Sequence, residues 1–223
     1  MKKLISILVA LLVVVSFFGF NAKTAYAATK IETVNVSISR TVDAFPGITV
    51  SATGLTVGSP TWSCTLSQLK NMSAGSRITA TFPITVKSGY YLAAPVKYKV
   101  TGTGATNYSI RMSVKNGKGT LSVTVPIYKQ LFMSKITWKT SSLPTWQKVS
   151  GASSYTIIVC DVSTGNKVAS KTTTGTSVNL DKMVSPGTYI VKIRANSGNS
   201  YILPSNYVQS WIIIAKVYAV PKG

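Results

Sequence analysis

Few side chains in this sequence could carry acid–base or nucleophilic chemistry. The 223 residues include no histidine, which excludes Ser-His-Asp and Cys-His arrangements and histidine zinc sites. The four carboxylates, Glu32, Asp43, Asp161 and Asp181, are scattered along the chain. Glycoside hydrolysis needs two carboxylates about 5 to 9.5 Å apart, and calcium needs several clustered oxygens. Only Asp161 and Asp181, which share the second predicted domain, could approach that separation, and coincidence explains the pair best, so we expect no enzyme, metal site or cofactor.

Two further nucleophile patterns fail on their context. Residues 67–70, "SQLK", fit the S-x-x-K motif of serine acylases. That motif needs a helix, so that Ser and Lys share a face, together with "SDN" and "KTG" segments that this chain lacks. We predict that residues 67–70 end a strand, which makes the match coincidental. Cys64 has no neighbouring base and shares the parity of apolar residues, so it is not expected to act as a nucleophile.

The first 27 residues have the tripartite pattern of a secretory signal peptide. Two lysines precede an apolar run at residues 4–20, and residues 25–27 read Ala-Tyr-Ala, an A-x-A cleavage pattern. The run is shorter than the ~20 residues that span a bilayer; an uncleaved anchor is the alternative. We expect cleavage after Ala27 and a secreted, extracellular or wall-associated mature chain without a transmembrane segment.

The mature chain would be strongly basic. Of 24 lysines and arginines, three precede residue 28, so 21 remain against four acids and the net charge is +17. Charge of this size favours association with polyanions. We expect an anionic cell-envelope polymer or an acidic glycan as partner, with a protein partner possible and intracellular nucleic acid excluded by the compartment. Alternatively, the lysines only solubilise strands and protect sheet edges.

Alternation with period two predicts an all-β chain of two tandem β-sandwich domains after the signal peptide. Seven strands are expected in the first domain, residues 28–130, and a second set follows in residues 131–223. The junction near residues 128–135 lacks the composition of a flexible tether, so we expect the domains to touch. The predicted strands of the first domain are residues 34–38, 48–50, 62–66, 78–86, 96–100, 108–114 and 121–127.

The two cysteines, Cys64 and Cys160, fall in different predicted domains. An exported chain can form disulfides. Cys160, however, lies on the strand parity opposite to the apolar row of Tyr155, Ile157 and Val159, so a bridge would require two faces to meet at the junction. We expect free thiols, with a bridge as the alternative.

Residues 134–217 resemble a fibronectin type III domain through "TWQKVSGASSYTIIV", "VNLDKMVSPGTYIVKIRAN" and "LPSNY". The pattern comprises Trp146 on the second strand, Tyr155 opening the third, Leu180 before a turn, and Tyr189 in the place of the corner tyrosine. The resemblance implies a sandwich in an extracellular setting and leaves function open. The sequence contains no "RGD", and its closing "SWIIIAK" is unusually apolar for the family.

The first domain is similar to immunoglobulin-like repeats of Gram-positive surface proteins. The similarity rests on "AGSRITATFPITVKSGYYL" and a closing "GTLSVTVPI". It implies an adhesive or spacer module without chemistry of its own.

Basic residues on strand faces are the candidate binding groups. A predicted hairpin through residues 102–106 places Lys97 opposite Arg111, with Lys99 and Lys115 on the same outer face. Like charges across a ladder are destabilising, so a cluster kept despite that cost suggests an anionic partner.

The strand "TYIVKIRAN" repeats this arrangement. Tyr189, Val191 and Ile193 are expected to face the core, which turns Lys192 and Arg194 outward. Two interpretations of this face are compatible with the sequence: a docking surface for an acidic polymer or partner, and a face that is only solvated.

Together these patterns predict a secreted, non-enzymatic binding or adhesion module of the bacterial cell envelope. It would bind an anionic polymer or glycan through its basic strand faces, and Tyr90, Tyr91 or Tyr201 would add a stacking platform for sugars if exposed. The alternative is a structural spacer or a set of protein-docking domains with no ligand of their own.

Overall fold

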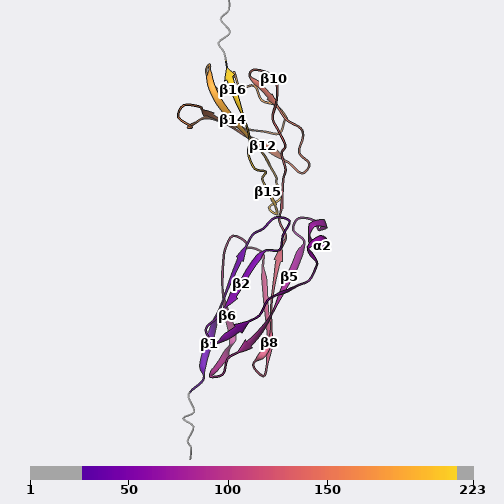
Figure 1. Cartoon of the computed structure of the whole chain (residues 1–223), viewed down its shortest axis with the longest axis vertical. Helices are drawn as coiled ribbons and strands as arrows, with labels where there is room; N and C mark the ends of the chain where they lie inside the picture. The colour runs from indigo at the N-terminus through magenta and orange to yellow at the C-terminus, as the bar shows by residue number, and fades with distance from the viewer. Residues whose placement is uncertain (1–26, 215–223) are drawn as a thin grey trace, which may run out of the picture.

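Strands make up nearly all the regular structure of this chain. A computed structural model describes residues 27–214, and in this part it contains a single short helix. The all-β class is therefore confirmed. The molecule is elongated, with two groups of strands placed end to end (Figure 1). Two hydrophobic cores accompany these groups, one built from residues 31–127 and the other from residues 131–208.

Two sheets enclose the first core. In the first sheet the order is β2-β1-β6, with β1 and β6 parallel. The second sheet has the order β3-β5-β8-β7, and β4 also pairs with β5. Alternate residues face inward as the sequence predicts: Val34, Ile78 and Leu121 are fully buried. The strands are β1 (Thr29–Ser39), β2 (Gly47–Ser51), β3 (Leu55–Val57), β4 (Thr61–Trp62), β5 (Arg77–Val86), β6 (Tyr90–Thr101), β7 (Ser109–Lys115) and β8 (Lys118–Pro126).

The predicted hairpin between β6 and β7 is wrong, because these strands lie in different sheets. The segment between them binds the end of β1 instead of reversing directly. Gly104 N donates to Ile38 O at 2.9 Å, and Arg40 N donates to Thr103 Oγ1 at 3.1 Å. Gly102 has a φ of +101°, and a Cβ there would collide with the Ile38 carbonyl oxygen. The close approach that glycine permits carries the chain from one sheet to the other.

The predicted strand at residues 62–66 is also wrong beyond Trp62. The chain turns instead into a short helix, α2 (Leu66–Asn71). Thr65 caps it: its Oγ1 accepts from Gln68 N at 3.3 Å, while Gln68 Oε1 accepts from Thr65 N at 2.8 Å. This reciprocal capping box stabilises a helix start against strand continuation. Leu66 is consequently 44% exposed, and Leu69 is the residue that enters the core.

The second core lies beneath a four-stranded antiparallel sheet of order β13-β12-β14-β16. Trp146 is buried in this core, with its ring centre 5.3 Å from that of Tyr155. Tyr189 donates its hydroxyl proton to Ser185 O at 2.8 Å. The strands of this half are β10 (Thr137–Thr140), β11 (Leu143–Thr145), β12 (Ser154–Asp161), β13 (Lys167–Thr173), β14 (Gly187–Asn196) and β16 (Val208–Ile214).

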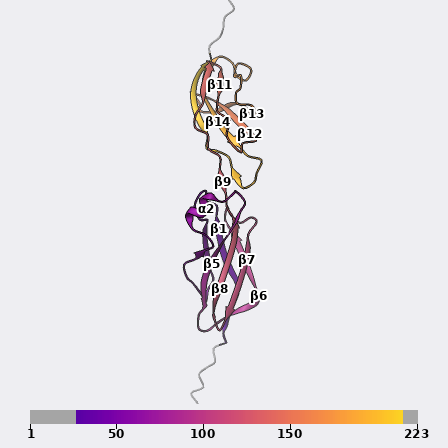
Figure 2. The same ribbon diagram turned by 90° about the vertical axis from the view of Figure 1, so that its right-hand side faces the viewer.

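The two halves contact each other through a short parallel pair, β9 (Lys129–Gln130) with β15 (Ile202–Leu203). Tyr201 lies at this contact: its ring is 5.8 Å from that of Tyr128, and its hydroxyl accepts from Asn107 Nδ2 at 3.1 Å. A Cβ at Gly75 would lie 2.8 Å from the Tyr201 ring, so only glycine leaves room for it. Figure 2 shows β9 and α2 near this narrow waist. The expected contact between the halves is present.

Candidate functional site

The carboxylates of Asp161 and Asp181, both in the second half, accept hydrogen bonds from loop residues. Asp161 accepts hydrogen bonds from the hydroxyls and backbone amides of Ser163 and Thr164. These bonds, the Ser163 hydroxyl foremost, lower the pKa of Asp161 below its ordinary 3.8. Asp181 accepts from Ser142 Oγ at 2.6 Å. Across residues 27–214, no group of three Cys, Asp or Glu side chains could hold a metal ion.

The S-x-x-K motif lies on a short helix, and the two cysteines lie in different halves of the molecule. Ser67 and Lys70 lie on α2, so the expectation that they end a strand is wrong; both side chains are exposed. The Lys70 carbonyl accepts from Lys129 Nζ at 2.7 Å. Cys64 is half-buried, Cys160 is buried, and both are free thiols. They belong to different halves of the molecule, as expected.

Lys97 and Lys99 project from the outer face of the β2-β1-β6 sheet. Their neighbours Tyr98 and Val100 pack against the first core, so alternation turns both lysines outward. Lys97 lies opposite Thr33 of β1, not opposite Arg111 as predicted. The two ion pairs in the described part of the chain, Lys30–Glu32 and Lys129–Asp43, leave both lysines uncompensated.

Arg111 and Lys115 project from the outer face of the other sheet. Both lie on β7, whose one strand partner in the described part of the chain is β8; Arg111 is opposite Ser122 and Lys115 is opposite Lys118. Because the outer faces of a sandwich point away from each other, these two cations do not merge with Lys97 and Lys99. The predicted four-residue cluster is therefore divided between two faces.

Lys192 and Arg194 lie on β14 in the second half and point outward, as their parity predicts. Lys192 is opposite Ile158 and Arg194 is opposite Thr156. Both side chains are half-buried. The Arg194 guanidinium carbon lies 4.9 Å from the centre of the Tyr207 ring, and its buried Nε has no hydrogen-bond partner among residues 27–214. A cation held against an aromatic ring is less available to a polyanion than an exposed lysine.

A shallow polar depression of about 260 Å³ surrounds Lys99 on the outer face of the first sheet. The register builds it: Asn35 of β1 lies between Ser51 of β2 and Lys99 of β6. One step along, Ser37 lies between Thr49 and Thr101. The sequence reasoning missed these hydroxyl and amide groups, although "NVSIS" and "TVS" place them at every second residue. The lining residues are Asn35, Val36, Ser37, Thr49, Ser51, Lys99 and Thr101.

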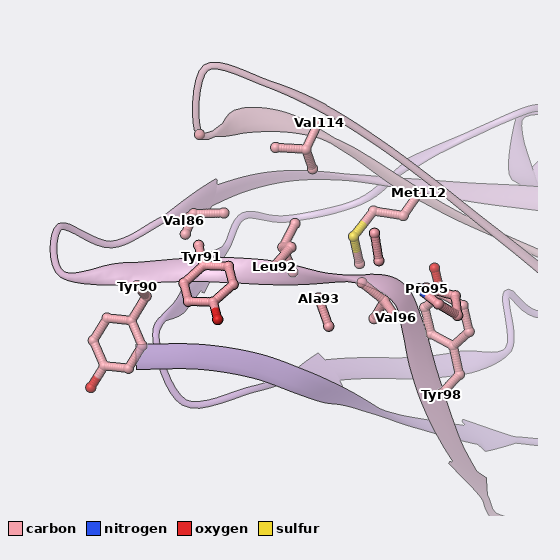
Figure 3. Close-up of a pocket in the computed structure, with 12 residues that line it drawn as sticks. Val86, Tyr90, Tyr91, Leu92, Ala93, Pro95, Val96, Tyr98, Met112 and Val114 are labelled. Carbon is pink, nitrogen blue, oxygen red and sulfur yellow. The ribbon is translucent and has the colours of Figure 1, made fainter. Parts of the chain in front are cut away.

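A larger groove, about 480 Å³, opens between β6 and β7 (Figure 3). Most of its lining side chains are apolar, and burial raises the pKa of Tyr98. The pairing of β1 with β6 is irregular here. Between the pair Ile31–Leu92 and the pair Thr33–Lys97, β6 contains three more residues than β1, and this irregular stretch of β6 lines the groove. The lining residues are Val86, Tyr90, Tyr91, Leu92, Ala93, Ala94, Pro95, Val96, Tyr98, Met112, Val114 and Gly117.

The three tyrosines considered as a sugar platform are therefore separated. Tyr90 and Tyr91 line the groove, and Tyr91 is 47% exposed. Tyr201 packs at the contact between the halves instead. Packing between the halves thus explains the position of Tyr201 without a sugar ligand.

Within residues 27–214 the structure contains no helix long and apolar enough to cross a membrane. Comparison with known proteins finds no matching protein-family model and no matching curated protein.

Proposed function

We propose that this chain is a secreted, non-enzymatic binding protein of the bacterial cell envelope that holds an anionic polymer or acidic glycan. The observation that carries the proposal is the polar depression around Lys99. It combines a cation that has no acidic partner among the described residues with hydroxyl and amide groups from three adjacent strands. Phosphate or carboxylate oxygens would accept from the ammonium group, and sugar hydroxyls would exchange hydrogen bonds with the serine and threonine side chains.

Lys97 extends this surface along β6. Alternating residues in a strand are about 6.6 Å apart, a separation suited to successive charges of a polymer rather than to one small anion. The remaining cations of the chain would supply long-range attraction, since the mature chain carries +17. Arg111 and Lys115, on the opposite face, and Lys192 and Arg194, in the second half, belong to this general field in the proposal.

The proposed architecture is a signal peptide of residues 1–27 followed by an immunoglobulin-like and a fibronectin type III-like sandwich. The hydroxyl bond from Tyr189 to Ser185 O supports the second assignment, because a corner tyrosine bonds to backbone a few residues upstream. The buried Trp146 beside Tyr155 is consistent with it.

The second candidate function is a spacer. The contacts of Tyr201 with Asn107 and Tyr128 favour it, because they hold the halves end to end. A spacer would present other domains or partners at a fixed distance and would need no ligand.

Retention on immobilised poly(glycerol phosphate), eluted with a salt gradient, separates the two functions. A binder is held by the surface around Lys97 and Lys99 and elutes as salt rises, whereas a spacer without a ligand is held by its net charge alone. The double variant Lys97→Glu/Lys99→Glu should elute much earlier than the wild type. The matched control, Lys139→Glu/Lys167→Glu, makes the same charge change at exposed positions of the second half. Equal shifts for both variants would mean that net charge alone drives retention, and the proposed site would be rejected.

A further inference from the structure

The groove between β6 and β7 lies beside two strands that are at the edges of their sheets. Among the strands of residues 27–214, β6 and β7 each occupy the edge of a sheet, so in this part of the chain each has one side without a strand partner. Edge strands present unpaired N–H and C=O groups to any strand that can align with them. The groove is distinct from the polar depression, which lies on the outer face of the first sheet.

The register of β7 fixes which of its backbone groups are unpaired. Asn116 and Gly117, with φ of 52° and 75°, form the two-residue turn between Lys115 and Lys118. Positive φ at both central residues is the type I′ geometry, in which the flanking pair is hydrogen-bonded. Since bonded and non-bonded pairs alternate in an antiparallel ladder, Arg111 and Ser113 also bond to β8.

The residues between them therefore direct their backbone groups to the free edge. These are Ile110, Met112 and Val114, whose side chains face the core. Met112 and Val114 are also the β7 residues that line the groove (Figure 3). The same residues thus offer unpaired amides at the edge and an apolar wall beside it, which are the two elements of strand addition.

Charge selects the partner. The outward side chains of β7 include Arg111 and Lys115, and Lys118, the first residue of β8, lies opposite Lys115. A second copy of β7 would bring its own arginine and lysine side chains to the same sheet face, where like charges repel. An acidic strand would instead pair its carboxylates with Arg111 and Lys115 on the outer face.

We propose that β7 accepts an extended segment of an acidic partner protein as an added strand. The segment alternates apolar and acidic residues: the apolar side chains enter the groove beside Met112 and Tyr98, and the acidic ones lie beside Arg111 and Lys115. This inference concerns a second ligand and does not depend on polymer binding by the outer face of the first sheet.

Amide hydrogen exchange tests the register directly. The probe is an acetylated and amidated peptide of four Val-Glu repeats, and the control peptide has the same composition with the valines and glutamates in separate blocks. Binding of the alternating peptide should slow exchange at Ile110, Met112 and Val114 and leave Arg111 and Ser113 unchanged, because the latter are already bonded to β8. Absence of binding, equal binding of the block peptide, or uniform slowing along β7 would overturn the proposal.

Substitutions provide a second test by fluorescence polarisation. Met112→Pro removes an edge N–H without breaking a ladder bond, so the fold should survive, and peptide binding should weaken by about tenfold or more. Circular dichroism checks that the variant is folded. Arg111→Glu/Lys115→Glu should lose the Val-Glu peptide and gain a Val-Lys peptide, whereas Lys139→Glu/Lys167→Glu should keep the original preference. Failure of the charge reversal to exchange the preference would refute pairing at β7.

Discussion

Replacing Tyr201 should uncouple the two halves of the molecule. Its hydroxyl accepts from Asn107 and its ring packs with Tyr128. A hydrogen bond contributes about 0.5–1.5 kcal/mol, and an aromatic pair contributes about 0.5–1.5 kcal/mol beyond burial. Tyr201→Ala should therefore weaken the contact by about 1–3 kcal/mol, whereas Tyr201→Phe keeps the ring and should cost about 1 kcal/mol.

Two measurements follow the uncoupling of the halves. In urea, the free energy of unfolding of the less stable half should fall by the amounts given above. The loss should be larger for Tyr201→Ala than for Tyr201→Phe. NMR relaxation should show the halves tumbling more independently in Tyr201→Ala. Tyr91→Ala removes an exposed tyrosine at the far end of the first half and should alter neither quantity. Unchanged unfolding and tumbling in Tyr201→Ala would refute the role assigned to this side chain.

Three further effects follow from the structure. Tyr189→Phe removes the bond to Ser185 O and should lower the free energy of unfolding in urea by about 1 kcal/mol; no loss would argue against a structural corner tyrosine. The Asp161 carboxyl should titrate below pH 3.8 by NMR, so its stabilising contribution is present above that pH and is lost as pH falls through the lowered pKa; a titration at or above 3.8 would contradict the loop geometry. Leu180→Ala should cost about 2–5 kcal/mol because this side chain is fully buried, whereas Leu66→Ala on exposed α2 should change stability little; similar losses would place Leu66 in the core.

Alternation predicts strands well where one face is continuously apolar. In β5 and β8, the residues at every second position are the buried ones, and the same rule correctly turns Lys192 outward. The rule fails for β13, whose Lys167–Thr173 segment is polar and is a strand because it bonds to β12 at a sheet edge. Propensity and pattern cannot detect a strand that depends mainly on its partner.

Pairing between strands is less accessible from sequence than the strands themselves. The outward orientation of Lys97 and Arg111 is predicted correctly, but it does not say whether their two strands lie in one sheet or in two. The close approach of Gly102 to Ile38 carries the chain from the first sheet to the second. The start of α2 could have been found, since Thr65 and Gln68 have capping-box spacing. The position of Arg194 is harder still to predict: its contact with Tyr207, the residue just before β16, joins β14 to a non-strand segment, and no local pattern in the sequence indicates it.

The salt dependence of binding to poly(glycerol phosphate), measured by calorimetry, tests the central claim most directly. Affinity should fall linearly on a log–log plot as salt rises, because each cation that contacts phosphate releases counterions. In Lys97→Glu/Lys99→Glu the slope should become shallower by at least about 1.4–1.8, at roughly 0.7–0.9 per lost contact. An affinity that does not change with salt, or a slope that the double variant leaves unaltered, would contradict polymer binding at this surface.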